Sequence, residues 1–210
     1  MEPQIQPAEL RRSRQREEAR RAILDATEAI LLEDGEENLS IRKLALRCGY
    51  TAPTIYHYFR DKDGLIDALL EERFSRLLQR VKRVQLSRDH VANLREYSRA
   101  FLRFVASNPT FYRVMMRGSS DGGERKIRAA EESQERMAAP LLALAQEGRL
   151  WAEDTDAAQQ SLWAILHGVV ALQLGNPKYG WSKNLADVAL ETVLRGLVRT
   201  APARNGKGSP

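Results

Sequence analysis

The sequence predicts an all-α protein of about nine helices, in which a small N-terminal domain precedes a larger helical bundle. Apolar residues recur at steps of three and four through most of the chain, as they do on one face of an α-helix. No stretch alternates apolar and polar residues as a half-buried strand does, and two short helical patterns meet at a glycine near residue 50. We predict an arm over 1–15, a first domain over 16–62, a second domain over 63–200 and a disordered tail over 201–210.

The N-terminal arm is strongly basic. Between Leu10 and Arg21 six arginines stand against two glutamates. A basic arm before a helix binds along phosphates or reaches into the minor groove of DNA, and it makes affinity depend on salt. The alternative for residues 1–10 is a solvated tail, and we expect the arm to be partly disordered. The first helix is predicted over 19–34 and ends at Gly35.

The segment from Leu39 to Lys62 is predicted to form two short helices joined by one tight turn. Ser40 stands where it can cap the first helix. Gly49 ends that helix, because a glycine just past a helix tolerates the left-handed backbone conformation. Thr51 then caps a second helix whose first turn contains Pro53. Helix, turn and helix together have the size of a helix-turn-helix motif.

The second of these helices has an inward and an outward face. Ile55 and Phe59 are one turn apart and are predicted to pack inward. The outward face consists of Ala52, Pro53, Thr54 and His57, flanked by Tyr56 and Tyr58. In a helix-turn-helix protein this face enters the major groove of DNA. The alternative is an ordinary helical hairpin, but the coincidence of cap, glycine, proline and aromatic cluster favours the DNA-reading motif.

At these residues the chain resembles the tetracycline-repressor (TetR) family of bacterial transcription regulators. The resemblance covers about 16–70 and includes the run Pro-Thr-Ile-Tyr-His-Tyr-Phe-Arg-Asp-Lys of 53–62. It implies a homodimer in which each N-terminal three-helix domain reads half of a palindromic site in double-stranded DNA. It also implies a C-terminal bundle that binds a small effector and dimerises. By this match we expect base contacts from Arg42, Thr54 and His57, and phosphate contacts from Ser40, Thr51, Tyr56, Tyr58 and Lys62.

The predicted recognition helix departs from a strong reader of bases. Residues 51–59 contain no Arg, Lys, Asn or Gln, the side chains that make bidentate contacts with base edges. We therefore expect Arg42 to carry most of the direct discrimination, with DNA shape supplying the rest.

The remaining helices are predicted from their apolar spacing and from capping residues. Their ranges are 62–84, 89–108, 110–117, 124–147, 154–174 and 185–200. Pro140 is expected to kink the helix that contains it, because proline removes one backbone hydrogen bond. The loop Gly118 to Gly123 is rich in serine and glycine and is predicted to be mobile.

The last two helices are apolar around too much of their circumference for burial on one side. We expect one side to pack on the chain's own bundle and the other on a second subunit. The predicted dimer interface comprises Leu162, Leu166, Val169, Val188, Val193 and Leu197. The run Trp-Ala-Ile-Leu-His-Gly over 163–168 also resembles the Trp-x-x-x-His-Gly (WHG) signature of one TetR C-terminal subclass.

Aromatic and apolar side chains in the second domain are the candidates for an effector pocket. They are Tyr97, Phe101, Phe104, Phe111, Met115, Leu144, Trp163 and His167. Core and pocket have the same composition, so a purely structural role for them stays open. His167 is either a hydrogen-bonded core residue or a ligand contact. A small, largely apolar effector follows from these residue types.

Other classes of function lack their signatures. No nucleophile elbow, phosphate loop or dinucleotide fingerprint occurs, so we expect neither an enzyme nor a bound cofactor. Cys48 is the single cysteine, and the three histidines show no metal-ligand spacing. No run is long enough to span a membrane and no secretory signal is visible, so a cytoplasmic protein is expected. We predict a repressor, with an effector-dependent activator or an architectural DNA-binding protein as alternatives.

Overall fold

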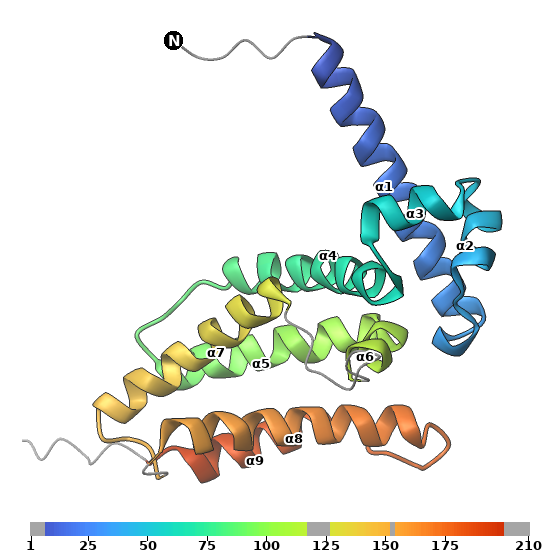
Figure 1. Ribbon diagram of the computed structural model, residues 1–210. Helices are drawn as coiled ribbons and strands as arrows, with labels where there is room; N and C mark the ends of the chain where they lie inside the picture. Colours follow the sequence, from blue (N-terminus) through green and yellow to red (C-terminus); the bar gives the residue numbers. More distant parts are fainter. Residues whose placement is uncertain (1–6, 117–126, 152–153, 200–210) are drawn as a thin grey trace, which may run out of the picture. The chain divides into compact units, whose positions relative to one another are not determined.

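The computed structural model describes residues 7–116, 127–151 and 154–199 (Figure 1). Over these residues it contains nine α-helices, one short 3-10 helix and no strand. The helices are α1 (Pro7–Glu33), α2 (Ile41–Cys48), α3 (Ala52–Phe59), α4 (Lys62–Lys82), α5 (His90–Ser107), α6 (Pro109–Met115), α7 (Arg128–Gln146), α8 (Thr155–Gly175) and α9 (Leu185–Leu197), with the 3-10 helix at Glu36–Asn38. The predicted all-α fold is confirmed. None of these helices is long and apolar enough to cross a membrane.

Helix ends follow the capping residues that the sequence predicts. The Ser40 side chain accepts a hydrogen bond from the Lys43 backbone N–H at the start of α2. Asp61 accepts from the backbone of Gly64 in α4, and Asp89 accepts from the first turn of α5. Each cap pairs a backbone donor that would otherwise have no partner inside its helix. At the end of α2, Gly49 has φ 74, the left-handed conformation that favours glycine.

The first helix is longer than predicted. It begins at Pro7 rather than near residue 19, so residues 7–15 of the expected arm are helical. Proline suits the first position of a helix, because that position needs no N–H donor. Arginine and glutamate are good helix formers, and Glu17 stands four residues before Arg21. Residues 1–6 lie outside the described part of the chain.

The chain divides into two compact units. The first unit comprises the described parts of Met1–Phe74 and Thr110–Arg128, and the second comprises those of Ser75–Pro109 and Ala129–Pro210. Helix α4 contributes to both, and α6 belongs to the first unit although it follows α5 in sequence. The predicted boundary at residue 62 therefore does not coincide with the boundary between the compact units.

The first unit packs α1, α2, α3 and the start of α4 around a buried apolar core. Its fully buried side chains include Ile23, Leu24, Ile30, Leu44, Ile55, Leu65 and Ile66. Burying one such side chain contributes about 1.5 to 3 kcal/mol. Ile55 and Phe59 both point into this core, as predicted. An ion pair between Glu28 and Arg73 also joins α1 to α4.

The junction between α3 and α4 is tight. Arg60 has φ 65 and ψ −54, and the Asp61 N–H donates to the Phe59 carbonyl oxygen over 2.8 Å. These values describe a γ-turn, which is strained for a residue other than glycine. At Gly64 a Cβ atom would collide with that same carbonyl oxygen of Phe59. Both features hold the end of α3 close against the start of α4.

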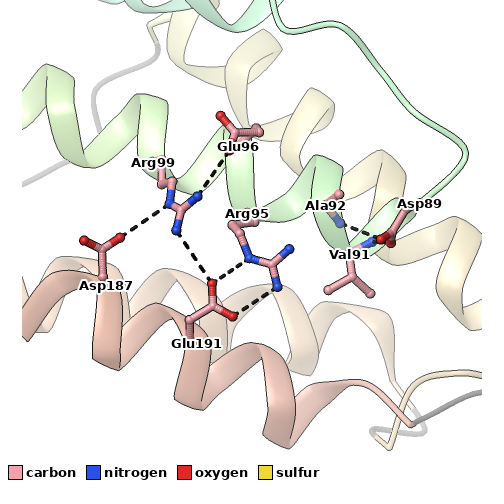
Figure 2. Close-up of polar contacts among 8 residues, drawn as sticks. All are labelled: Asp89, Val91, Ala92, Arg95, Glu96, Arg99, Asp187 and Glu191. Carbon is pink, nitrogen blue, oxygen red and sulfur yellow. Dashed lines mark hydrogen bonds and ion pairs between the residues drawn. The ribbon is translucent and has the colours of Figure 1, made fainter.

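In the second unit α8 and α9 pack against each other and α5 packs against both. Figure 2 shows Arg95 and Arg99 of α5 reaching the carboxylates of α9. The Arg95 Nε and Nη2 atoms lie 2.6 and 3.0 Å from the two oxygens of Glu191, and Arg99 Nε lies 3.4 Å from Asp187. The Arg95 guanidinium holds the pKa of Glu191 below its usual value. This pairing fixes one face of α5 on α9.

Some sequence predictions for this region differ from the structure or lie outside it. Pro140 is buried inside α7, which runs from Arg128 to Gln146, and the kink expected there stays a prediction. The last helix ends at Leu197, where the predicted range reached residue 200. The glycine-rich loop and the tail from residue 201 lie outside the described residues.

Candidate nucleic-acid interface

Two of the three basic side chains of α2 form ion pairs with the end of α1, and the third does not. Arg47 forms a fork with Glu33 of α1, with two N···O distances of 2.6 Å, and this hydrogen bonding holds the pKa of Glu33 below its usual value. Lys43 Nζ lies 2.9 Å from Asp34. Arg42 is exposed and forms no ion pair with any described residue. The acidic end of α1 thus neutralises two cations of α2 and leaves Arg42 available.

Hydroxyl groups occupy the starts of both motif helices. Ser40 and Thr51 are exposed, and each accepts a hydrogen bond from a backbone N–H in its helix. The two hydroxyl oxygens of Thr51 and Thr54 lie 2.8 Å apart. A hydroxyl that accepts from the backbone still carries its own proton. Ser40 therefore retains a donor that suits a phosphate oxygen, whereas one of the two hydroxyls of Thr51 and Thr54 donates to the other and only the second keeps a free donor.

The outward face of α3 carries the residues that the sequence places there. Pro53, Tyr56 and His57 are exposed, while Ala52 and Thr54 are half-buried. Tyr58 is half-buried as well, and its ring stands edge-on to that of His57 at 5.6 Å between centroids. Edge-to-face contact of this kind stabilises the positions of the two rings relative to each other.

Two cations flank the end of α3. Lys62 donates from Nζ to the Glu36 carbonyl oxygen over 3.3 Å and remains exposed. Arg60, which the sequence analysis did not single out, has a side chain that is 91% exposed. The sequence predicts that Arg60 follows the end of this helix, but it gives no signal for the positive φ of Arg60. Together these residues place positive charge beside an exposed aromatic and hydroxyl surface.

The candidate effector residues of the second unit are mostly buried. Tyr97, Phe101, Phe104 and Leu144 lie in its core, and burial raises the pKa of the Tyr97 hydroxyl. His167 is 8% exposed, and desolvation lowers its pKa to about 4. The imidazole is therefore neutral at physiological pH.

Three rings from α5 and α8 are stacked. The His167 ring centroid lies 4.2 Å from that of Trp163 and 4.9 Å from that of Phe101. Trp163 is 45% exposed, so the stack runs from the surface of the second unit into its core. A ligand entering beside Trp163 would meet aromatic faces and one neutral imidazole.

Two predicted effector residues belong to the first unit. Phe111 packs edge-to-face on Phe74, with ring centroids 5.5 Å apart, and Met115 is half-buried. Phe111 also lines a cavity of about 20 Å³, the space of a single water molecule. In the second unit an open groove of about 520 Å³ is lined by Arg80, Val84, Ala100, Arg103, Ala106 and Ser107, none of which was predicted.

The predicted interface residues of α8 and α9 differ in their burial within the single chain. Leu162 and Leu166 are 2% and 1% exposed within the single chain, and Val169 and Leu197 are buried as well. Leu162 and Leu166 thus pack within the chain's own core, whereas Val169 and Leu197 each keep 9% of their surface exposed. Val193 is half-buried, and Val188 alone of the predicted interface residues is exposed. The large apolar side chains that are exposed on these helices are Trp163, Ile165, Leu172 and Val188.

Comparison with known proteins follows the same division of the chain. Residues 23–69 match the family described as bacterial regulatory proteins, tetR family. Residues 94–197 match the tetracyclin repressor-like C-terminal domain. The HTH-type transcriptional regulator BetI of Serratia proteamaculans is 39% identical over 72 residues, and BetI of Escherichia coli strain K12 is 40% identical over 58. The first match covers 34% of this chain and 36% of that regulator, and the second covers 28% and 30%.

Solved structures share the fold over most of the chain. A protein of unknown function from Rhodococcus sp. RHA1 has a TM-score of 0.71 at 24% identity and covers 86% of this chain and 96% of its own. SmeT, the repressor of the Stenotrophomonas maltophilia multidrug efflux pump SmeDEF, has a TM-score of 0.66 at 23% identity, covering 91% and 97%.

The fold and the exposed α3 surface define a helix-turn-helix DNA-binding transcription regulator. Both parts of the chain match regulators of one kind, the first through the DNA-reading helices and the second through the helical bundle. The chain belongs to the TetR family.

Proposed function

We propose that the protein is a repressor that binds a palindromic operator as a homodimer and leaves it when a small, largely apolar effector binds. The observation that carries this proposal is the exposed, capped α3 helix next to the unpaired Arg42. A two-fold dimer would present two such helices to successive major grooves about one helical turn of DNA apart. Quantitative binding to duplexes from the protein's own promoter region tests this. Sequence-selective binding to a palindrome supports it, and binding that ignores sequence would favour an architectural role.

Arg42 and Lys62 are expected to make different kinds of contact. Arg42 is the unpaired cation of α2, so Arg42→Ala should cost about 1 to 3 kcal/mol of binding and relax one position of the site. Lys62 lies beyond α3, so Lys62→Ala should weaken binding to all sequences alike and lower the salt slope by about one for each subunit of the dimer. Binding of both variants to a panel of single-base operator variants separates these effects. Identical sequence profiles for the two variants would contradict the assignment.

The proposed dimer uses the exposed apolar side chains of α8 and α9. Ile165, Leu172 and Val188 are 41%, 51% and 51% exposed, and Ala164 and Ala171 are exposed between them on α8. Small residues let a second helix approach closely, and a second copy offers the same surface in return. Two copies would form a four-helix interface that removes these side chains from water.

Sedimentation equilibrium of charged variants tests this interface. Leu172→Glu is expected to raise the dimer dissociation constant by at least about tenfold, because a charge would be buried at the contact. Leu86→Glu is the control, since Leu86 is 62% exposed and lies outside α8 and α9. An unchanged dissociation constant for Leu172→Glu would place the contact elsewhere.

The effector is proposed to bind at the ring stack of the second unit. Trp163, His167 and Phe101 offer aromatic faces, and the neutral imidazole places no charge among them. Apolar planar compounds should therefore release the protein from the operator, and Trp163→Ala should weaken that release without changing operator affinity. A promoter assay distinguishes repression from effector-dependent activation, because an activator would bind the operator only in the presence of the compound.

A further inference from the structure

The N-terminal turns of α1 are highly exposed and basic. Residues 8–18 are all exposed, and the helix carries arginines at positions 11, 12, 14, 16, 20 and 21. None of these six guanidiniums forms an ion pair with a described residue. In Figure 1 this part of α1 continues beyond α3 as a helix with no neighbour among the other described helices of the first unit. A helix that is exposed all round and basic is expected to have a partner of opposite charge.

The arginines fall on two sides of the helix. The buried stripe of α1 contains Ile23, Thr27 and Ile30, and steps of three and four residues continue it backwards to Arg20, Arg16 and Arg12. We refer to Arg12, Arg16 and Arg20 as the arginine row. The row thus prolongs the side of α1 that faces the rest of the first unit.

One contact fixes the direction of the row. The Arg20 guanidinium carbon lies 5.9 Å from the centre of the Phe59 ring, the last residue of α3. The row therefore begins at the end of the recognition helix and runs away from it along α1. At 1.5 Å per residue it extends about 12 Å from Arg20 to Arg12. That length corresponds to roughly three to four base-pair steps of DNA.

The other side of the same helix differs in charge pattern. Arg14 and Arg21 alternate with Glu18 and Asp25 at steps of three and four, so positive and negative charges neighbour each other there. In the arginine row, three cations follow one another, and Glu9 lies one turn before Arg12 at the tip. The row is thus the concentrated positive surface, whereas the opposite side is a mixed surface facing solvent.

We propose that the arginine row binds the phosphates of the DNA that flanks the half-site occupied by α3. This inference rests on the proposed operator binding and adds a second element to it. The helical extension would lengthen the DNA footprint beyond the bases that α3 reaches, and it would add affinity without adding sequence discrimination.

Two charge-matched double variants test the proposal. R12Q/R16Q removes two cations of the row, and R14Q/R21Q removes two from the opposite side of the same helix. Arg20 is left in place because it contacts Phe59. Each variant is titrated with two operator duplexes, one ending at the edges of the half-sites and one longer by about one helical turn at each end. Circular dichroism confirms that each variant remains folded.

On the longer duplex, R12Q/R16Q is expected to lose at least roughly tenfold in affinity and to lower the salt slope by about 3.6, because a homodimer on two half-sites loses two phosphate contacts in each subunit. On the shorter duplex it should match the wild type, and R14Q/R21Q should change little on either. Equal losses in the two double variants, or a loss by R12Q/R16Q that ignores duplex length, would overturn the proposal. A wild-type protein that binds no operator selectively would instead contradict the proposed function itself.

Discussion

The α2–α3 motif and the α8–α9 pair are both helical hairpins, but different forces determine their faces. In the motif each helix begins at a side-chain cap, and apolar residues form one inward stripe. In the α8–α9 pair apolar residues surround the helices. Asp154 caps α8, but the Asn184 side chain accepts from the Ser182 hydroxyl and caps no backbone N–H of α9. The comparison indicates that local signals specify the motif, whereas packing decides which side of α8 and α9 is buried.

The largest expected effect contrasts two leucines of α2. Leu44 is 0% exposed and Leu46 is 81% exposed, although they are two residues apart. Leu44→Ala should lower the free energy of unfolding by about 2 to 5 kcal/mol, because it leaves a cavity in the first unit. Leu46→Ala should change it by no more than about 0.5 kcal/mol. Urea denaturation measures both, and similar losses would show that the inward stripe does not stabilise the motif.

The second effect is a pH dependence of the free energy of unfolding that arises from His167 in the core of the α8–α9 pair. Burial lowers the pKa of His167 to about 4 from an unfolded value near 6.5, so the unfolded chain binds more protons between those values. Stability is therefore fully present above about pH 6.5 and declines as the pH falls toward 4. Between pH 7 and 5 the free energy of unfolding should drop by about 2 kcal/mol more than in His167→Phe.

The pH range from 7 to 5 separates the titration of His167 from that of the carboxylates. The carboxylates with lowered pKa values, Glu33, Glu132 and Glu191, lose their stabilising charge only as the pH falls below about 4.5. They contribute equally to the wild type and the variant above pH 5. If the two proteins show the same pH slope between 7 and 5, the imidazole is not buried as described.

The smallest effect compares the helix starts. Thr51 accepts a hydrogen bond from the Thr54 N–H, so Thr51→Ala should cost about 1 kcal/mol of stability. Asn184 occupies the same position in α9 without such a bond, and Asn184→Ala should be nearly neutral. Thermal unfolding of the two variants distinguishes them, and equal shifts in melting temperature would remove this difference between the hairpins.

The sequence predicted those parts of the molecule that depend on neighbouring residues. Ser40, Thr51 and Gly49 determine helix ends within one turn of themselves, so the motif and its outward face followed directly. Leu162 and Leu166 were assigned to a partner because α8 is apolar on several sides, and spacing cannot rank those sides by burial. The early start of α1 was missed because its first turns are exposed in the described part of the chain, and the apolar stripe used to locate helices begins only near Ile23.

The tight junction between α3 and α4 restricts which residues position 64 can hold. The Phe59 carbonyl oxygen occupies the space that any larger residue at position 64 would need. In a library of all substitutions at this position, glycine alone should survive selection for operator binding, even though glycine has no side chain to offer to a base. A residue of this kind would look like part of the DNA-reading surface in a mutational screen, while its actual role is to keep α3 seated on α4.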